Sequence, residues 1–336
     1  SGLLNDVRVV GTSLEDHSRE SFVEFAGKAV EEFSSRKDEM KDFIEFAERL
    51  YFVRSDAGPD ALRAVVAEAE EGYEGNERPR RLHYLSVPPK AALSVIQTLA
   101  AADLAANSRV VMEKPFGTDL VSAVELNRKL HEVFSEEQIF RIDHFLGKEA
   151  ALNILAFRFA TGLFEPIWHR NHIDHVQIDV PETLGLETRA SFYEATGAYR
   201  DMVVTHLFQV LAFTAMEPPT SLEPQAITEE KNKVFRSMMP IMPENVVRGQ
   251  FHGYRDLDGV APESETETFI ALKCFIDNWR WAGVPFYLRT GKRLAEGQRI
   301  ISIAFKEPPK SMFPAGSGVS QHGPDHLTFD LADKSR

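Results

Sequence analysis

Residues 141–149 read Arg-Ile-Asp-His-Phe-Leu-Gly-Lys-Glu and place a carboxylate, an imidazole and an ammonium group within six residues of one another. The segment before them, Gln-Ile-Phe at 138–140, is typical of a short buried strand. After them, apolar residues recur at helical spacing from 148 to 159. The stretch is therefore predicted to lie where a strand is followed by a helix, a position at which α/β proteins commonly bind ligands.

The charged residues of this stretch suit two different tasks. Lys148 falls in the first turn of the predicted helix, with His144 just before it. Unpaired backbone amides and partial positive charge at a helix N-terminus favour a phosphate or another small anion. Asp143 would repel such an anion, so we expect it to orient and polarise an imidazole elsewhere in the chain.

Composition narrows the class of protein. The chain has 336 residues, 43% of them hydrophobic and 26% charged, which is ordinary for a globular enzyme large enough for two cores. No apolar run reaches membrane-spanning length. The net charge of −13 disfavours nucleic acid. Any anionic ligand would therefore need a local basic pocket, which draws attention to Lys114, Lys148 and Lys292.

Cysteine content and the N-terminal residues bear on the compartment. Cys274 is the single cysteine, so no intrachain disulfide can form, and its apolar neighbours predict a buried side chain. The first residues do not form a basic segment followed by an apolar one, which is the pattern of a secretory signal. We therefore expect a cytoplasmic protein without nucleic-acid or membrane partners.

Strand and helix patterns divide the chain into two parts. Strands are predicted at 8–13, 50–53, 82–87 and 110–113, and helices at 19–33, 59–69 and 90–104. This alternation predicts a parallel, doubly wound α/β sheet. Beyond residue 150, helices at 150–159 and 197–216 mix with alternating segments at 176–180, 269–275, 286–289 and 300–305. These segments predict a large, mainly antiparallel sheet backed by helices, which is an α+β arrangement. We expect a Rossmann-like coenzyme domain at 1–145 and a substrate and oligomerisation domain at 146–336.

Several segments resemble the glucose-6-phosphate dehydrogenase family. Residues 141–149 match its R-I-D-H-Y-L-G-K-E motif, with Phe145 in place of the tyrosine. Residues 111–117, Val-Met-Glu-Lys-Pro-Phe-Gly, are similar to its E-K-P-F-G segment, and residues 200–206, Arg-Asp-Met-Val-Val-Thr-His, to its R-D-x-x-Q-N-H segment. Residues 85–89 and 289–294 also agree in order and spacing, so the resemblance extends over nearly the whole chain.

The resemblance implies an activity. The family oxidises glucose 6-phosphate at C1 to 6-phosphogluconolactone, with hydride transfer to NADP or NAD, at the entrance to the pentose phosphate pathway. Its third motif assigns His206 as the base that takes the proton of the C1 hydroxyl, and Asp143 as the carboxylate paired with that histidine. Without the resemblance, a lone histidine in a helix is more often structural than catalytic.

The resemblance also implies binding residues. Those for glucose 6-phosphate are His144, Lys148 and Lys292 at the phosphate, with Glu182 and Asp201 at the sugar hydroxyls. Those for the coenzyme are Lys114, Pro115 and Pro88, and the Lys114–Pro115 bond is cis in the family. Asp201 and His206 lie five residues apart on one predicted α-helix, so their side chains should diverge by about 140° and contact different atoms of one sugar.

Departures from the family pattern concern the coenzyme. The family begins with a strand and a G-x-x-G-D-L-A loop that holds the pyrophosphate, and no such loop precedes Gly11. We therefore expect an incomplete Rossmann-like domain and, at the other end, an incomplete sheet domain. Leu14 stands where the family usually has an arginine for the 2′-phosphate of NADP, and Glu15 and Asp16 follow it. NAD is thus expected to serve about as well as NADP, unless Arg19 turns back to supply a cation.

Further departures leave a second interpretation open. Gly297 replaces a second basic residue that usually follows Lys292, and Phe145 lacks the tyrosine hydroxyl. With the absent loop, these changes also fit a catalytically silent sugar-phosphate-binding or regulatory paralogue. In either case the family association through its sheet implies a homodimer or homotetramer.

Three histidines at three-residue spacing, His169, His172 and His175, raise the question of a metal site. A turn that enters a strand cannot hold all three on one face, and supporting ligands are not evident. We therefore expect no metal.

Overall fold

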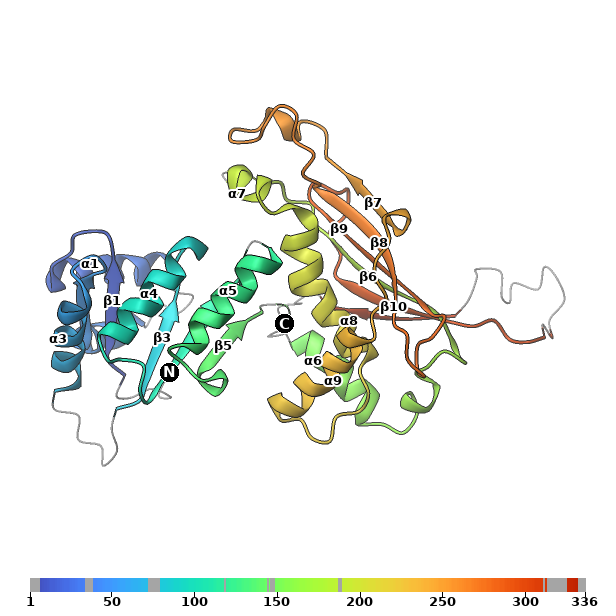
Figure 1. Cartoon of the computed structure of the whole chain (residues 1–336), viewed down its shortest axis with the longest axis horizontal. Coiled ribbons are helices and arrows are strands. Elements are labelled where there is room, and N and C mark those ends of the chain that lie inside the picture. The colour runs from blue at the N-terminus through green and yellow to red at the C-terminus, as the bar shows by residue number, and fades with distance from the viewer. Residues whose placement is uncertain are drawn as a thin grey trace. The chain divides into compact units, whose positions relative to one another are not determined.

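The computed structural model describes residues 7–33, 39–71, 79–117, 119–143, 145, 149–186, 189–310, 312 and 325–331. The chain divides into two compact units, Ser1–Arg141 and Ile142–Arg336 (Figure 1). The predicted boundary at residue 145 placed Asp143 in the first domain. In the structure Asp143 and Phe145 belong to the second unit, as does His206.

The first unit contains the predicted strands and helices in the predicted order, and in addition two helices that were not predicted, at Glu39–Ala47 and Leu120–His131. Its elements are β1 (Val9–Ser13), α1 (Arg19–Phe33), α2 (Glu39–Ala47), β2 (Leu50–Arg54), α3 (Pro59–Glu70), β3 (Arg81–Leu85), α4 (Pro89–Ala101), β4 (Ser108–Glu113), α5 (Leu120–His131), the 3₁₀ turn η1 (Glu136–Gln138) and β5 (Ile139–Ile142). β1 pairs with β2 in parallel, and β3, β4 and β5 form a second sheet in that order, with β3 and β4 parallel. This is a Rossmann-like arrangement.

The segment between β4 and α5 has a fixed path. The Lys114–Pro115 peptide bond is cis, as the resemblance implied. Gly117 has φ +102°, and a Cβ atom there would lie 2.6 Å from the backbone nitrogen of Ala123, so a larger residue does not fit. Asp119 then caps α5, because its carboxylate accepts from the Ser122 amide at 2.7 Å. These contacts fix the backbone that follows Lys114 and Pro115.

The second unit is built on a six-stranded sheet. The strands are β6 (Ile173–Pro181), β7 (Val246–Gly249), β8 (Phe269–Phe275), β9 (Pro285–Gly291), β10 (Ile300–Phe305) and β11 (His326–Asp330), in the spatial order β11-β10-β6-β9-β8-β7. All neighbours are antiparallel except β6 and β9, which are parallel. The prediction of a mainly antiparallel sheet is confirmed, and its single parallel pair proves important for the site.

Helices cover one face of this sheet (Figure 1). They are α6 (Glu149–Phe159), α7 (Ala190–Glu194), the π-helix η4 (Tyr199–Leu207), α8 (Phe208–Ala215) and α9 (Pro224–Arg236). The unit also contains the 3₁₀ turns η2 (Glu165–Ile167), η5 (Pro243–Asn245) and η6 (Tyr254–Asp256). Strand residues facing the helices, such as Ile178 and Phe286, pack with Leu207 and Trp281 into one core. Cys274 is buried there as predicted, and burial raises the pKa of its thiol to about 12.

A buried arginine fixes the end of α8. Arg158 of α6 is fully buried. Its guanidinium donates hydrogen bonds to the backbone oxygens of Phe213 at 3.1 Å, Thr214 at 3.0 Å and Met216 at 2.8 Å. It thereby satisfies carbonyls that the end of a helix leaves without partners. Burial lowers the pKa of Arg158 to about 10, and its ion pair with Glu165 opposes that effect. The continuous helix formed by η4 and α8 is therefore anchored at its C-terminal end.

Among the residues that the structure describes, none of the helices combines the length and the apolar character needed to cross a membrane.

Candidate active site

The central pair of the second unit is Asp143 and His206. Asp143 follows β5, and His206 lies near the end of η4 with only 3% of its surface exposed. The imidazole Nδ1 lies 2.7 Å from Oδ1 of Asp143. An ionised carboxylate can only accept, so the proton of this hydrogen bond is carried by Nδ1. In the neutral imidazole the other ring nitrogen, Nε2, then carries the lone pair, which is the form that a general base needs.

Phe145 supports both members of the pair. Its backbone amide donates to the same Oδ1 atom of Asp143 at 2.9 Å. Its ring stacks on the imidazole of His206, with a centroid separation of 4.4 Å and an interplanar angle of 22°. The ring that replaces the family tyrosine therefore still holds the histidine in place, although it has no hydroxyl to offer to a ligand.

A second cluster forms where the two parallel strands end. β6 and β9 run in register, with Pro181 opposite Gly291, so the residues that follow them lie side by side. These are Glu182 and Lys292, and their side chains form a hydrogen-bonded ion pair. Lys292 is 8% exposed, and its Nζ also lies 4.0 Å from Oδ2 of Asp201. Three of the residues predicted to bind substrate are thus brought together.

The helix that carries Asp201 and His206 differs from the prediction. An α-helix would separate the two side chains by about 140°. Residues 199–207 form a π-helix instead, in which the Phe208 amide bonds to the carbonyl of Val203, five residues back. This wider turn brings residues five apart toward one face, so the predicted divergence is wrong. Asp201 reaches Lys292 while His206 reaches Asp143, and π-helical turns often occur at such sites.

Tyr193 joins the second cluster without having been predicted. It lies on α7, is 3% exposed, and its ring centroid lies 6.0 Å from Lys292 Nζ. Its hydroxyl is buried and has no hydrogen-bond partner among the described residues. The pKa of Tyr193 is raised, chiefly by burial and then by the charges of Asp201, Glu267 and Glu182. Nothing in its sequence neighbourhood marks this tyrosine, because only the tertiary fold brings it to Lys292.

Two predicted phosphate residues, His144 and Lys148, lie outside the described residues. A cation that was not predicted lies beside Phe145, because the guanidinium carbon of Arg299 is 5.7 Å from the centroid of the Phe145 ring. Arg299 and Gly297 line a cavity of about 380 Å³ together with Glu182. The cavity therefore retains a cation although Gly297 replaces a basic residue.

The predicted coenzyme residues belong to the first unit. Pro88 caps the start of α4 just after β3, and Lys114 and Pro115 follow β4. β3 and β4 are parallel neighbours, so all three residues lie at the carboxyl edge of their sheet. That edge is where sheets of this type bind nucleotides.

The region of Leu14 contains more carboxylates than free cations. Leu14 follows the end of β1 and is 72% exposed. Oδ1 of the neighbouring Asp16 lies 3.9 Å from Nη1 of Arg54. The Arg54 guanidinium also donates two hydrogen bonds to the carboxylate of Asp56. Arg19 does not turn back, because its guanidinium donates to the backbone oxygens of Leu50 and Glu48 at 2.8 and 2.5 Å. The compensation by Arg19 that the sequence left open is therefore absent.

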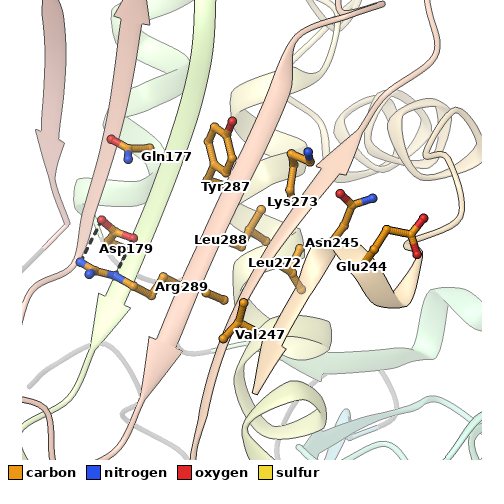
Figure 2. Close-up of a pocket in the computed structure, with 11 residues that line it drawn as sticks. Gln177, Asp179, Glu244, Asn245, Val247, Leu272, Lys273, Tyr287, Leu288 and Arg289 are labelled. Carbon is orange, nitrogen blue, oxygen red and sulfur yellow. Dashed lines mark hydrogen bonds and ion pairs between the residues drawn. The ribbon is translucent and has the colours of Figure 1, made fainter. Parts of the chain in front are cut away.

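The opposite face of the sheet carries a separate hollow (Figure 2). Its volume is about 470 Å³, and its lining includes Gln177, Asp179, Lys273, Tyr287 and Arg289. These residues alternate along β6, β8 and β9 with the buried ones that face the helices. Figure 2 shows Arg289 paired with Asp179 across the neighbouring strands. The hollow is therefore on the face away from the Asp143–His206 pair.

Comparison with known proteins identifies the chain. The family model described as the NAD binding domain of glucose-6-phosphate dehydrogenase matches residues 1–153, and the one described as the C-terminal domain matches residues 155–336. A Rossmann-like unit followed by a sheet unit with a buried Asp–His pair places the chain among the two-domain dehydrogenases. The chain belongs to the glucose-6-phosphate dehydrogenase family.

Individual relatives agree with this assignment. Glucose-6-phosphate 1-dehydrogenase of Rhizobium meliloti is 45% identical over 332 residues, covering 93% of this chain and 66% of the relative. That of Zymomonas mobilis is 40% identical over 338 residues, covering 95% and 68%. The chain thus spans about two thirds of the length of the curated relatives it matches.

Solved structures show the same fold. The crystal structure of glucose-6-phosphate 1-dehydrogenase from Mycobacterium avium aligns with a TM-score of 0.87 at 36% identity, covering 97% of this chain and 71% of that one. A glucose-6-phosphate dehydrogenase in complex with its substrate glucose 6-phosphate aligns with a TM-score of 0.86 at 32% identity, covering 97% and 69%.

Proposed function

We propose that the protein to which this chain belongs is a glucose-6-phosphate dehydrogenase that oxidises C1 of its sugar phosphate to the lactone and reduces NADP or NAD. The observation that carries this proposal is the buried Asp143–His206 pair, which holds an imidazole in the tautomer of a general base. The family membership and the complex of a relative with glucose 6-phosphate support the choice of substrate.

In the proposed reaction, His206 Nε2 accepts the proton of the C1 hydroxyl while C1 loses a hydride. Asp143 stabilises the imidazolium that forms, because its carboxylate already accepts from Nδ1. Glu182 and Asp201 accept hydrogen bonds from sugar hydroxyls, and Lys292 holds these two carboxylates together. His144 and Lys148, which the sequence motif supplies, are proposed to bind the phosphate together with Lys292.

The coenzyme supplies the hydride acceptor when it is bound. The residues proposed to hold it are Pro88, Lys114 and Pro115, and their chemistry fits a nucleotide. A lysine and a turned backbone stand at the carboxyl edge of two parallel strands. The Gly117 turn keeps that backbone in a path which a side chain would obstruct.

Turnover by the complete protein tests the proposal. Glucose 6-phosphate should drive reduction of NADP or NAD, followed by the absorbance of the reduced nicotinamide, whereas glucose alone should be far poorer. Binding of glucose 6-phosphate without any turnover would favour the silent paralogue. The intact geometry of the Asp143–His206 pair argues against that alternative.

Coenzyme choice gives a prediction of its own. Leu14 provides no cation, and Arg54 is already paired with Asp56 and close to Asp16. We expect the wild-type protein to use NAD about as well as NADP. Leu14→Arg should shift the ratio of kcat/KM values toward NADP by about ten- to a hundredfold, because a charge-assisted hydrogen bond contributes about 1.5 to 3 kcal/mol.

The matched control for this change is Leu14→Gln, which adds a polar side chain without charge and should leave the ratio nearly unchanged. A wild-type ratio that strongly favours NADP and does not move in Leu14→Arg would show that other residues read the 2′-phosphate.

Self-association is the remaining part of the proposal. Among the described residues, no α-helix of the second unit covers the outer face of the sheet, and the 3₁₀ turn η5 borders the hollow of Figure 2 on that face. We propose that copies associate through this face as a homodimer or homotetramer. Light scattering on the complete protein measures the mass, and a monomer at micromolar concentration would contradict the idea.

A further inference from the structure

The helix that carries Asp201 and His206 is capped by a residue from a distant part of the chain. The amide of Tyr199, the first residue of η4, donates to Oε1 of Glu267 at 2.9 Å. The amide of Ala198 before it donates to the backbone oxygen of Glu267, also at 2.9 Å. The first amides of a helix have no partners within the helix, and the helix dipole favours a carboxylate at this end. Glu267 therefore serves as the cap of η4.

Gly197 leaves the space that this carboxylate occupies. Its φ is +72°, a left-handed value that favours glycine. A Cβ atom at this position would lie 2.7 Å from Oε1 of Glu267 and 3.0 Å from Oε2. The turn that enters η4 is therefore shaped around the side chain of Glu267.

The same segment also holds the backbone of Lys292. Thr268, which follows Glu267, is fully buried, and its backbone oxygen accepts from the Lys292 amide at 2.9 Å. Asp201 is the third residue of η4, and its Oδ2 lies 4.0 Å from Nζ of Lys292. Two adjacent residues, Glu267 and Thr268, thus hold the two elements whose side chains meet at the proposed sugar-hydroxyl site.

We propose that Glu267 is a positioning residue for the sugar, whose carboxylate holds the first turn of η4 in the place from which Asp201 faces Lys292. The inference rests on the proposed function and deepens it, because it makes the order of the sugar-hydroxyl site depend on a residue outside that site. Glu267 acts through Asp201 and does not contact the sugar.

The two ends of η4 should respond differently when the cap is lost. His206 lies near the C-terminal end, where Asp143 accepts from its ring and Phe145 stacks on it. Arg158 anchors α8, into which η4 continues. Fraying of the first turn would displace Asp201 and leave the imidazole in place. Binding of the sugar should therefore weaken while the proton-transfer step is preserved.

The test compares Glu267→Ala, Glu267→Gln and Glu265→Ala in the complete protein. In Glu267→Ala we expect KM for glucose 6-phosphate to rise about tenfold, because loss of a helix cap typically changes an equilibrium by about that factor. The kcat should stay within about threefold of the wild type. Glu267→Gln keeps an oxygen that can accept from Tyr199, so its KM should stay within about threefold. Glu265→Ala removes the same charge from an exposed position of the same segment and should match the wild type.

An unchanged KM in Glu267→Ala, or a kcat that falls as far as KM rises, would reduce Glu267 to a residue of the fold and overturn the proposal. A second measurement does not depend on the substrate. Followed by NMR, the Tyr199 amide should exchange its hydrogen faster in Glu267→Ala than in the wild type, whereas the Phe208 amide, which bonds to Val203, should not. If no variant turns over glucose 6-phosphate but this difference is seen, the proposed function fails and the hold of Glu267 on η4 stands; equal exchange rates would contradict that hold itself.

Discussion

Replacement of His206 by Asn should lower kcat at least about a hundredfold, because a positioned general base contributes about 10² to 10⁴ in rate. Asn can still donate to Asp143 Oδ1, so the buried carboxylate keeps a partner and the fold should persist. Binding of glucose 6-phosphate should change little, because the proposed phosphate and hydroxyl contacts come from other residues. Steady-state kinetics and calorimetry on the complete protein measure the two effects separately.

The second unit offers a matched control for this variant. His175 on β6 forms a comparable pair, with its Nδ1 2.8 Å from Oδ2 of Asp174, away from the proposed site. His175→Asn should retain kcat within about threefold, since surface pairs contribute little. If His206→Asn kept more than about a tenth of the wild-type kcat, the assignment of the base would be wrong.

Replacement of Lys292 by Met should raise KM for glucose 6-phosphate about a hundredfold or more and also lower the free energy of unfolding. Lys292 is almost fully buried between Glu182 and Asp201. Loss of one partner from a buried ion pair costs about 3 to 5 kcal/mol, since the remaining carboxylates are left uncompensated. The two like charges would then repel each other and no longer hold the sugar hydroxyls in one geometry.

Lys273→Met is the control for charge alone, because Lys273 lies on β8 at the opposite face of the sheet. It should leave KM unchanged within about twofold, because that face is turned away from the Asp143–His206 pair. Lys292→Arg keeps the charge and should recover most of the stability but only part of the binding. Unchanged KM in Lys292→Met, with lower stability, would show that Lys292 only supports the fold.

Local patterns predicted most of the secondary structure. Periodicity located many of the strands and helices on both sides of residue 145, since burial of one face imposes its own repeat on each element. It did not predict α2, α5, α7, β7 or β11. The family motifs led to Asp143 and His206, which the structure brings to 2.7 Å, and to a cis Lys114–Pro115 bond. The roles of these residues stay predictions until the variants are measured.

Contacts that depend on tertiary structure were not predictable in the same way. The ion pair of Glu182 with Lys292 exists because β6 and β9 pair in parallel within a mainly antiparallel sheet. Strand patterns do not specify that direction of pairing. The sequence does not distinguish this π-helix from an α-helix, because apolar spacing differs little between the two over nine residues. Tyr193 reaches Lys292 only through the tertiary fold, which leaves no local signal.

The most direct test of the central claim follows the hydrogen at C1. The complete protein would be given glucose 6-phosphate that carries deuterium at C1, together with NADP or NAD, and the reduced coenzyme would be examined by mass spectrometry. The account predicts that each turnover transfers the deuterium to the nicotinamide ring, and that His206→Asn slows this transfer at least about a hundredfold. Reduced coenzyme without deuterium, or no reduction at all by the wild-type protein, would contradict it.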